Sequence, residues 1–221
     1  NASATNALFT VGGNNASTNF PGQFEGTITL VKTGTGTLTL SGANAFTNGA
    51  RVLGGTLRLS PLPVTIRNAG FELPAMGAAG WAYLTGDGVT GGWTMSGHPI
   101  ENNGSGIARN GSPWVGTAPQ GVQIGYLQSA SHCFQTVTVQ RAGTYQLAFA
   151  AANRPGYPAA NVEVLVDGSS AASWNSAAFA NGGAFKSYAT NFALAAGTHE
   201  LRFQGTSAGG DTTTVIDDIR L

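Results

Sequence analysis

The stretch Arg67-Asn68-Ala69-Gly70-Phe71-Glu72 divides the chain, because the residues before it and after it follow different patterns. Its counterpart is the closing segment, Val215-Ile216-Asp217-Asp218-Ile219-Arg220-Leu221. Short runs of alternating apolar and polar residues fill the sequence between the two. The first segment and the last therefore predict the entrance and the closing strand of one domain.

Alternation with a period of two indicates β-strands with one buried face. Turn signals such as Ala142-Gly143 and Asp167-Gly168 separate the runs, and no helical period persists. Short strands with regular turns predict an antiparallel β-sandwich or jelly roll. The alternating runs are residues 122–126, 137–139, 145–152, 162–166 and 201–204.

The motifs of this region resemble the galactose-binding-like β-sandwiches found among carbohydrate-binding modules. The resemblance covers residues 64–221 and is carried by the Asn-x-Gly-Phe-Glu entrance at 68–72, Gly92-Trp93-Thr94, and the closing Ile216-Asp217-Asp218-Ile219. It implies a jelly-roll fold. It fixes the ligand less well, because one fold hosts many functions.

The first 62 residues contain internal repeats. Gly26-Thr-Ile-Thr-Leu30, Gly36-Thr-Leu-Thr-Leu40 and Gly55-Thr-Leu-Arg-Leu59 are versions of one short strand, and the last two lie 19 residues apart. This spacing fits one coil of a parallel β-helix, with leucine inside and threonine outside. Residues 20–60 closely resemble the autotransporter-associated β-helix repeat. We therefore expect an all-β chain: a β-helix segment, the end of a stalk, over 1–62 and a jelly roll over 63–221, with Pro61 and Pro63 at the boundary.

Composition excludes several classes of protein. Charged residues make up 9% of the chain, and ten basic residues balance ten acidic ones. No basic face is therefore available for nucleic acid, and no run of 18 apolar residues predicts a membrane span.

Residues 1–10 lack the pattern of a signal peptide. Cys133 is the only cysteine and is expected to be a small buried residue. Low charge without cysteine pairs favours a bacterial secreted or cell-surface protein.

No pattern for catalysis is visible in the sequence. The acidic residues are scattered, and Asp217 and Asp218 cannot both face one cleft from a regular strand. His98, His132 and His199 lack the spacing of metal ligands, and no Gly-x-Ser-x-Gly motif occurs. The sequence therefore predicts that the chain is not an enzyme.

The galactose-binding-like resemblance implies a structural Ca²⁺ held by Glu72 and Asp218 together with backbone carbonyls. Asp217 points away from Asp218 in a regular strand, so only one of the two can join Glu72. The alternative is that these carboxylates form ion pairs with Arg67, Arg202 or Arg220.

Aromatic and polar residues in loops and on one strand face are the candidates for ligand binding. Sugars offer apolar faces to aromatic rings and hydroxyls to amides and guanidinium groups. The pair Arg154 and Tyr157 is favoured, and core packing is the stronger alternative for Trp93. The expected ligand-binding residues are Tyr83, Trp93, Trp114, Gln123, Gln146, Asn153, Arg154 and Tyr157.

Together these features predict a non-catalytic carbohydrate-binding module on a β-helix stalk, with a polysaccharide or other glycan as its partner. The alternative is a structural module that assembles an extracellular filament or surface layer. In that case its partners are copies of itself or a longer β-helix.

Overall fold

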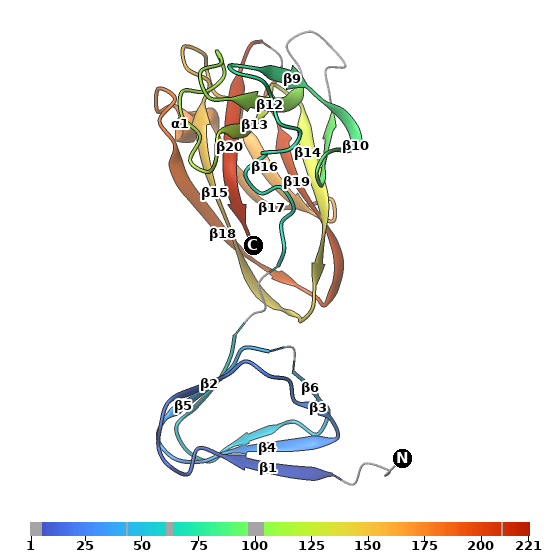
Figure 1. Ribbon diagram of the computed structural model, residues 1–221, viewed down its shortest axis with the longest axis vertical. Helices are drawn as coiled ribbons and strands as arrows, with labels where there is room; N and C mark the ends of the chain where they lie inside the picture. The colour runs from blue at the N-terminus through green and yellow to red at the C-terminus, as the bar shows by residue number, and fades with distance from the viewer. Residues whose placement is uncertain (1–5, 43, 61–63, 97–103, 209) are drawn as a thin grey trace. The chain divides into compact units, whose positions relative to one another are not determined.

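The computed structural model describes residues 6–42, 44–60, 64–96, 104–208 and 210–221. The chain forms two compact units, Asn1–Pro63 and Val64–Leu221 (Figure 1). The predicted boundary prolines, Pro61 and Pro63, lie outside the described residues. The boundary at residue 62 therefore stays a prediction.

The first unit is a short parallel β-helix. Its strands form three faces, ordered β1-β4-β7, β2-β5-β8 and β3-β6, and all pairings are parallel. The strands are β1 (Ala7–Val11), β2 (Thr18–Phe20), β3 (Glu25–Gly26), β4 (Ile28–Lys32), β5 (Thr37–Leu40), β6 (Ala45–Phe46), β7 (Ala50–Val52) and β8 (Thr56–Leu59).

Only two of the three repeats predicted from the sequence stack directly on each other in the β-helix. Leu38 of β5 pairs with Leu57 of β8, so the two repeats 19 residues apart are successive coils of one face. Ile28 of β4 instead pairs with Ala7, which places the repeat at 26–30 on a different face. The reason is spacing: the repeat at 26 precedes the one at 36 by ten residues, too few for a full coil.

Aliphatic and aromatic side chains fill the inside of the β-helix. Leu30 and Leu40 are fully buried, and Phe24 joins them in the same cluster. Lys32 is also buried, at 1% exposure. Its Nζ donates to the carbonyls of Thr33, Gly34 and Gly54 at one corner, so the lysine satisfies polar groups that the turns leave open.

The second unit is an antiparallel sandwich of two six-stranded sheets, ordered β10-β11-β14-β19-β16-β17 and β18-β15-β20-β13-β12-β9. One short helix, α1 (Ser176–Phe179), precedes β18. The strands are β9 (Trp81–Tyr83), β10 (Thr85–Thr90), β11 (Trp93–Ser96), β12 (Ser105–Arg109), β13 (Gln123–Gln128), β14 (His132–Val139), β15 (Gly143–Asn153), β16 (Val162–Val166), β17 (Ser169–Trp174), β18 (Lys186–Leu194), β19 (Gly197–Gly205) and β20 (Thr213–Arg220).

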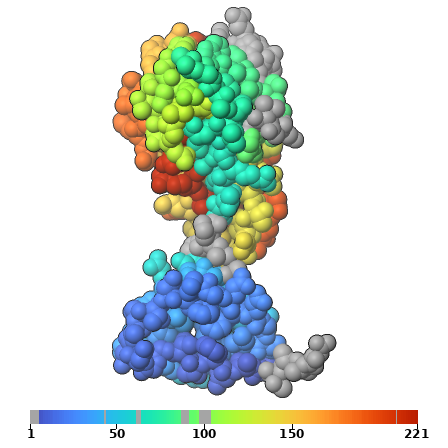
Figure 2. Space-filling model, in the orientation of Figure 1, coloured from blue at the N-terminus to red at the C-terminus, as the bar shows by residue number. Residues whose placement is uncertain are grey.

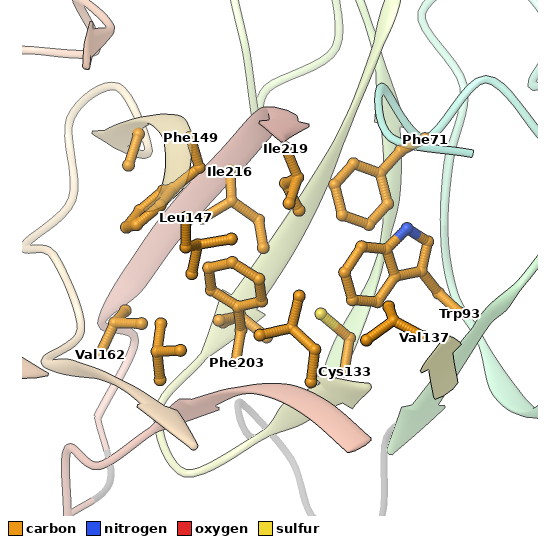
Figure 3. Close-up of a cluster of buried hydrophobic side chains, with 14 of the residues drawn as sticks. Phe71, Trp93, Cys133, Val137, Leu147, Phe149, Val162, Phe203, Ile216 and Ile219 are labelled. Carbon is orange, nitrogen blue, oxygen red and sulfur yellow. The ribbon is translucent and has the colours of Figure 1, made fainter. Parts of the chain in front are cut away.

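The main core lies between the two sheets (Figure 3). Phe71 stacks on Trp93 at a centroid distance of 5.3 Å, and Phe149 and Phe203 continue the packing. Cys133 lies in this core as a buried free cysteine, as predicted. The entrance segment contacts the closing strand, because the Val64 N–H donates to Leu221 O and the Ile219 N–H to Ala69 O.

The predicted fold class, an all-β chain with a short β-helix followed by an antiparallel jelly roll, is confirmed. Within the described ranges, no helix has the length and apolar character that a membrane span requires.

Candidate functional site

A second cluster of buried residues lies on the outer face of the β18-β15-β20-β13-β12-β9 sheet. Alternation along β13 turns Gly125 and Leu127 toward the main core, whereas Ile124 and Tyr126 face outward. The loop before β13 covers these outward residues with Trp114. Figure 2 shows the chain around residues 70–80 (teal) and 110–120 (yellow-green) side by side on the surface of this unit.

Four rings form what we call the outer aromatic cluster: Trp81, Tyr83, Trp114 and Tyr126. Trp114 stacks on Tyr126 with centroids 4.0 Å apart, and Tyr83 meets the Tyr126 ring edge-on at 5.5 Å. Trp81 lies 5.3 Å from Trp114. Trp114 and Tyr126 are buried, but Trp81 is 44% exposed, so the cluster presents aromatic surface to a ligand.

A chain of polar contacts borders the cluster. The Tyr83 hydroxyl donates to Gln128 Oε1 at 2.6 Å, and Gln128 Nε2 donates to Asp211 Oδ1 at 2.6 Å. Arg154 Nη1 lies 3.3 Å from Asp211 Oδ2. Asp211 thus accepts from two donors, an amide and a guanidinium, which is the environment that an ionised carboxylate requires.

Arg154 also stacks on aromatic rings. Its Cζ lies 4.3 Å from the centroid of Trp114 and 3.8 Å from that of Tyr157, and its Nε donates to Pro113 O. The Arg154 side chain is 12% exposed, and Tyr157 is 38% exposed. Such cation–π contacts contribute about 0.5–2 kcal/mol each, more when they are shielded from water.

Burial keeps the two tyrosines neutral. It raises the pKa of Tyr83, with the negative charge of Asp211 adding to the effect, while Arg154 and Gln128 oppose it. Burial likewise raises the pKa of Tyr126. The site therefore offers phenols as hydrogen-bond partners beside the carboxyl group of Asp211.

The structure brings together Tyr83, Trp114, Arg154 and Tyr157 among the predicted ligand-binding residues. Trp114 was expected in an exposed loop, but it is buried beneath Arg154. Asn153 lies next to them in a structural role: its Nδ2 donates to Arg154 O and Tyr157 O, and its Oδ1 accepts from two backbone amides.

The other predicted ligand-binding residues lie elsewhere. Trp93 is fully buried in the main core, and its Nε1 donates to Asn68 O. Gln123 is buried at the inner side of β13, where Nε2 donates to Phe71 O and Oε1 accepts from the Met76 N–H. Gln146 is exposed on the outer face of β15. The two glutamines therefore lie on opposite faces of one sheet and form no common groove.

Sequence analysis did not single out Tyr126, Gln128 or Asp211 as members of this site. Asp211 lies 57 residues beyond Arg154, with no motif around it. Gln128 and Tyr126 belong to a run that reads as an ordinary alternating strand. Only the pairing of β13 with β20 at Gln128 and Thr213 brings the start of β20 to this edge.

The carboxylates expected to bind calcium are arranged differently from the prediction. Glu72 Oε1 accepts from the N–H groups of Val122 and Gln123 at 2.8 and 2.9 Å. Asp217, rather than Asp218, is fully buried near it: Oδ2 accepts from the Gln120 N–H at 2.7 Å, and Oδ1 has no hydrogen-bond partner among the residues that the structure describes. Asp218 forms an ion pair with Arg220 at 3.0 Å.

The pKa of Asp217 is raised to about 7, mainly by burial, with the charges of Asp218 and Glu72 adding to the effect and two backbone amides opposing it. No cluster of three or more His, Cys, Asp or Glu side chains suited to a metal occurs in the described part of the chain. Any metal at Glu72 and Asp217 would therefore need backbone or water oxygens as well.

Comparison with known proteins identifies the second unit. Residues 62–221 match the model of the HpiC1-like family, described as HpiC1 cyclase. Residues 30–59 match the passenger-associated-transport-repeat, which agrees with the predicted resemblance to an autotransporter repeat. No curated protein matches the chain.

Solved structures share the fold. The Stig cyclase Fisc from Fischerella sp. TAU, in complex with (3Z)-3-(1-methyl-2-pyrrolidinylidene)-3H-indole, is 19% identical with a TM-score of 0.57, covering 73% of this chain and 96% of that one. A cyclase from Fischerella sp. TAU, in complex with 4-(1H-indol-3-yl)butan-2-one, is 20% identical with a TM-score of 0.54, covering 72% and 96%.

These findings correct the functional predictions. The family is one of cyclases, so the expectation of a non-catalytic carbohydrate-binding module is wrong, and so is the alternative of a filament module. The expected glycan partner is also wrong, since the cyclases of this fold hold indole compounds. The sequence failed here because the fold's entrance and closing motifs serve the architecture rather than the ligand.

Proposed function

Because the chain belongs to the HpiC1-like family of cyclases, we propose that residues 62–221 catalyse ring closure of a small aromatic substrate of the indole type. The observation that supports the site most strongly is a carboxylate, Asp211, held beside the outer aromatic cluster by Gln128 and Arg154. The indole ligands of the Fischerella cyclases support the substrate class.

The two parts of the site suit two needs of this chemistry. An indole ring stacks on aromatic surface, and the partly exposed Trp81 and Tyr157 offer such surface. When an indole carbon attacks the carbon of a carbonyl side chain, a C–C bond forms while the C=O π bond breaks, and its electron pair goes to the oxygen, which takes a proton from water. The indole ring is cationic until it loses a proton of its own. The aromatic faces and Asp211 stabilise that cation, and Asp211 accepts the proton. Tyr83 and Gln128 are positioning residues, because they hold Asp211 in place.

Turnover tests this proposal. The purified chain is incubated with a panel of indole compounds that carry an alkene or carbonyl side chain, and products are analysed by mass spectrometry and NMR. We expect a product with one more ring, formed about 10²–10⁴-fold more slowly by Asp211→Asn, which keeps the shape but lacks the base. Asp218→Asn is the matched control, since Asp218 pairs with Arg220 away from the cluster. Equal rates in both variants would reject Asp211 as the base.

For the metal, we propose Ca²⁺ bound by Glu72 and Asp217, with backbone carbonyls and water completing six to eight oxygens. The support is the buried Oδ1 of Asp217, which has no hydrogen-bond partner in the described part of the chain, beside a second carboxylate. Bound Ca²⁺ would tie the entrance segment to β20 and so stabilise the fold.

Thermal unfolding with calcium and with EDTA tests this metal site. We expect Ca²⁺ to raise the melting temperature of the wild type and of Asp218→Asn, but not of Asp217→Asn. A Ca²⁺ response that survives in Asp217→Asn and disappears in Asp218→Asn would return the site to the pair that the sequence predicted.

For location, we propose that the chain is exported to the cell surface, with the β-helix as the end of a stalk. The match of residues 30–59 to a passenger-associated-transport-repeat supports this. Protease treatment of intact cells that produce the protein would remove an exported domain and spare an internal one.

A further inference from the structure

The guanidinium group of Arg154 contacts the faces of two aromatic rings and one carboxylate. Its Cζ lies 4.3 Å from the Trp114 centroid and 3.8 Å from the Tyr157 centroid, and Nη1 lies 3.3 Å from Asp211 Oδ2. We call this combination of two rings and Asp211 the Arg154 slot. Because the Arg154 side chain is 12% exposed, the slot is largely closed to water.

These three groups select a planar cation. The negative face of an aromatic ring attracts positive charge, and the attraction grows when water is excluded. Asp211 supplies the neutralising charge and repels an anion. A neutral ring stacks on Trp114 or Tyr157 equally well but gains nothing from the carboxylate.

A second observation points to a ligand at the same place. Below Arg154, the Trp114 Nε1 and the Tyr126 hydroxyl are buried and have no hydrogen-bond partner within the described ranges. A buried polar group without a partner is unfavourable, because it has given up its hydrogen bonds to water. The Arg154 guanidinium carries only donors, so it cannot accept from the Trp114 N–H. A ligand with an acceptor atom can.

Building on the proposed cyclase function, we infer that the Arg154 slot is the subsite for the planar, positively charged part of the substrate or of the cation formed during ring closure. Arg154 occupies the slot when no ligand is bound, and the ligand displaces it. Asp211 then exchanges one counter-ion for another without losing its charge partner. The slot thus favours the charged state of the reaction over the neutral one.

Arg202 provides a matched control. Its guanidinium also stacks on an aromatic ring, with Cζ 4.5 Å from the Phe134 centroid, and its Nε donates to Glu200 Oε1 at 2.9 Å. It lies on the other sheet, in β19, and contacts one ring rather than two. Removing Arg202 therefore deletes the same kinds of contact without opening a slot.

The test measures binding of a permanent planar cation that carries an acceptor oxygen, 6-methoxy-1-methylquinolinium, and of the neutral quinoline without the N-methyl group, 6-methoxyquinoline at pH 8, by isothermal titration calorimetry. We expect Arg154→Ala to bind the cation at least about tenfold more tightly than it binds the neutral quinoline, and more tightly than the wild type does. Adding Asp211→Asn to Arg154→Ala should abolish the preference for charge. Arg202→Ala should bind as the wild type does.

Equal binding of the cation and the neutral quinoline by a folded Arg154→Ala variant, or no binding of either, overturns the inference. Near-UV circular dichroism checks the fold, and Arg154→Met, which keeps an aliphatic stem over the rings, replaces Arg154→Ala if that variant unfolds. A parallel titration of the wild type with neutral 4-(1H-indol-3-yl)butan-2-one separates the two ideas. If the wild type binds this indole but the Arg154→Ala variant shows no preference for the cation, the proposed function stands and only the inference about the Arg154 slot is rejected. If the wild type does not bind the indole, the result counts against the proposed function itself.

Discussion

Asp217 is turned toward Glu72 by an irregularity of one residue. Opposite β15, strand β20 pairs Asp217 with Ala150 and Arg220 with Ala148, so β20 carries an extra residue there. Asp218 takes a φ of 50°, in the left-handed region. This bulge lets Ile216 and Ile219 both enter the main core, which strict alternation would forbid. The sequence-based choice of Asp218 assumed a regular strand, and this bulge interrupts the alternation on which that choice rested.

The raised pKa of Asp217 predicts how stability depends on pH without metal. The folded pKa, about 7, lies above the unfolded value, so the folded state holds a proton that the unfolded state has lost between about pH 4 and 7. In EDTA the free energy of unfolding should therefore fall as pH rises through this window. Urea unfolding of wild type and Asp217→Asn from pH 4.5 to 8 checks this. A wild-type profile parallel to that of the variant would contradict it.

His199 and Asp167 predict a second pH dependence at another place, with loss of stability on both sides of a window. His199 Nδ1 lies 2.7 Å from Asp167 Oδ2. This hydrogen bond is the main cause that raises the pKa of His199 and lowers that of Asp167, and the Ala195 carbonyl also raises the His199 pKa. The pair should contribute fully to the free energy of unfolding at pH values between the unfolded-state pKa of Asp167 and that of His199. This contribution should be lost as pH rises through the folded pKa of His199, and as pH falls through that of Asp167.

Because Asp167 is half exposed, the pair should contribute only on the order of 0.2–1 kcal/mol. A double-mutant cycle with His199→Gln and Asp167→Asn, measured at pH 5.5 and pH 9, isolates the interaction. A coupling energy that is larger at pH 9 than at pH 5.5 would be inconsistent with an ion pair.

At the scale of elements, β12 positions the outer aromatic cluster by leaving space. Gly106 pairs with Tyr83 on one side and Tyr126 on the other. A Cβ at Gly106 would lie 2.0 Å from Ala82 O and 2.5 Å from the Tyr126 hydroxyl oxygen. Glycine therefore allows both tyrosines to share one face of the sheet.

Gly106→Ala should shift Tyr126 and lower the free energy of unfolding by about 1–3 kcal/mol, the usual effect of an added methyl group in a packed site. It should also weaken binding of indole ligands. Gly116→Ala is the control, because a Cβ there meets no atom within 4 Å. Equal stability of the two variants, measured by urea unfolding, would show that β12 adjusts without strain.

Periodicity predicted the strands but only part of the site. Alternation in residues 145–152 and 162–166 gave the correct elements, since each strand buries one face. Arg154 and Tyr157 were predicted because they share a loop. Asp211 and Gln128 come from elements that meet only through the pairing of β13 with β20, and no local pattern reports such a pairing. Trp114 shows the same limit, because its loop position did not indicate burial, whereas core packing was already the stronger alternative for Trp93 and the structure buries it in the core.

At the scale of the whole molecule, the family match and the structural division coincide. The HpiC1-like region covers residues 62–221, and the second compact unit covers Val64–Leu221. Each unit has a core of its own: the β-helix cluster contains Leu30 and Leu40, and the sandwich core contains Phe71 and Phe203. Separate cores predict separate unfolding.

We expect residues 62–221, produced alone, to fold and to unfold at the same temperature as the sandwich does within the full chain. Lys32→Met should lower only the β-helix transition, because it removes the donor to three corner carbonyls. Differential scanning calorimetry of the chain, the fragment and the variant measures this. A single transition shifted by Lys32→Met as a whole would mean that the two units unfold together.

The most direct test of the central claim is a crystal structure of residues 62–221 with 4-(1H-indol-3-yl)butan-2-one. We predict the indole ring against Trp81 or Tyr157, within hydrogen-bond distance of Asp211. An indole bound at another surface, with the outer aromatic cluster and Asp211 unchanged, would contradict the account and place the cyclase site elsewhere in the sandwich.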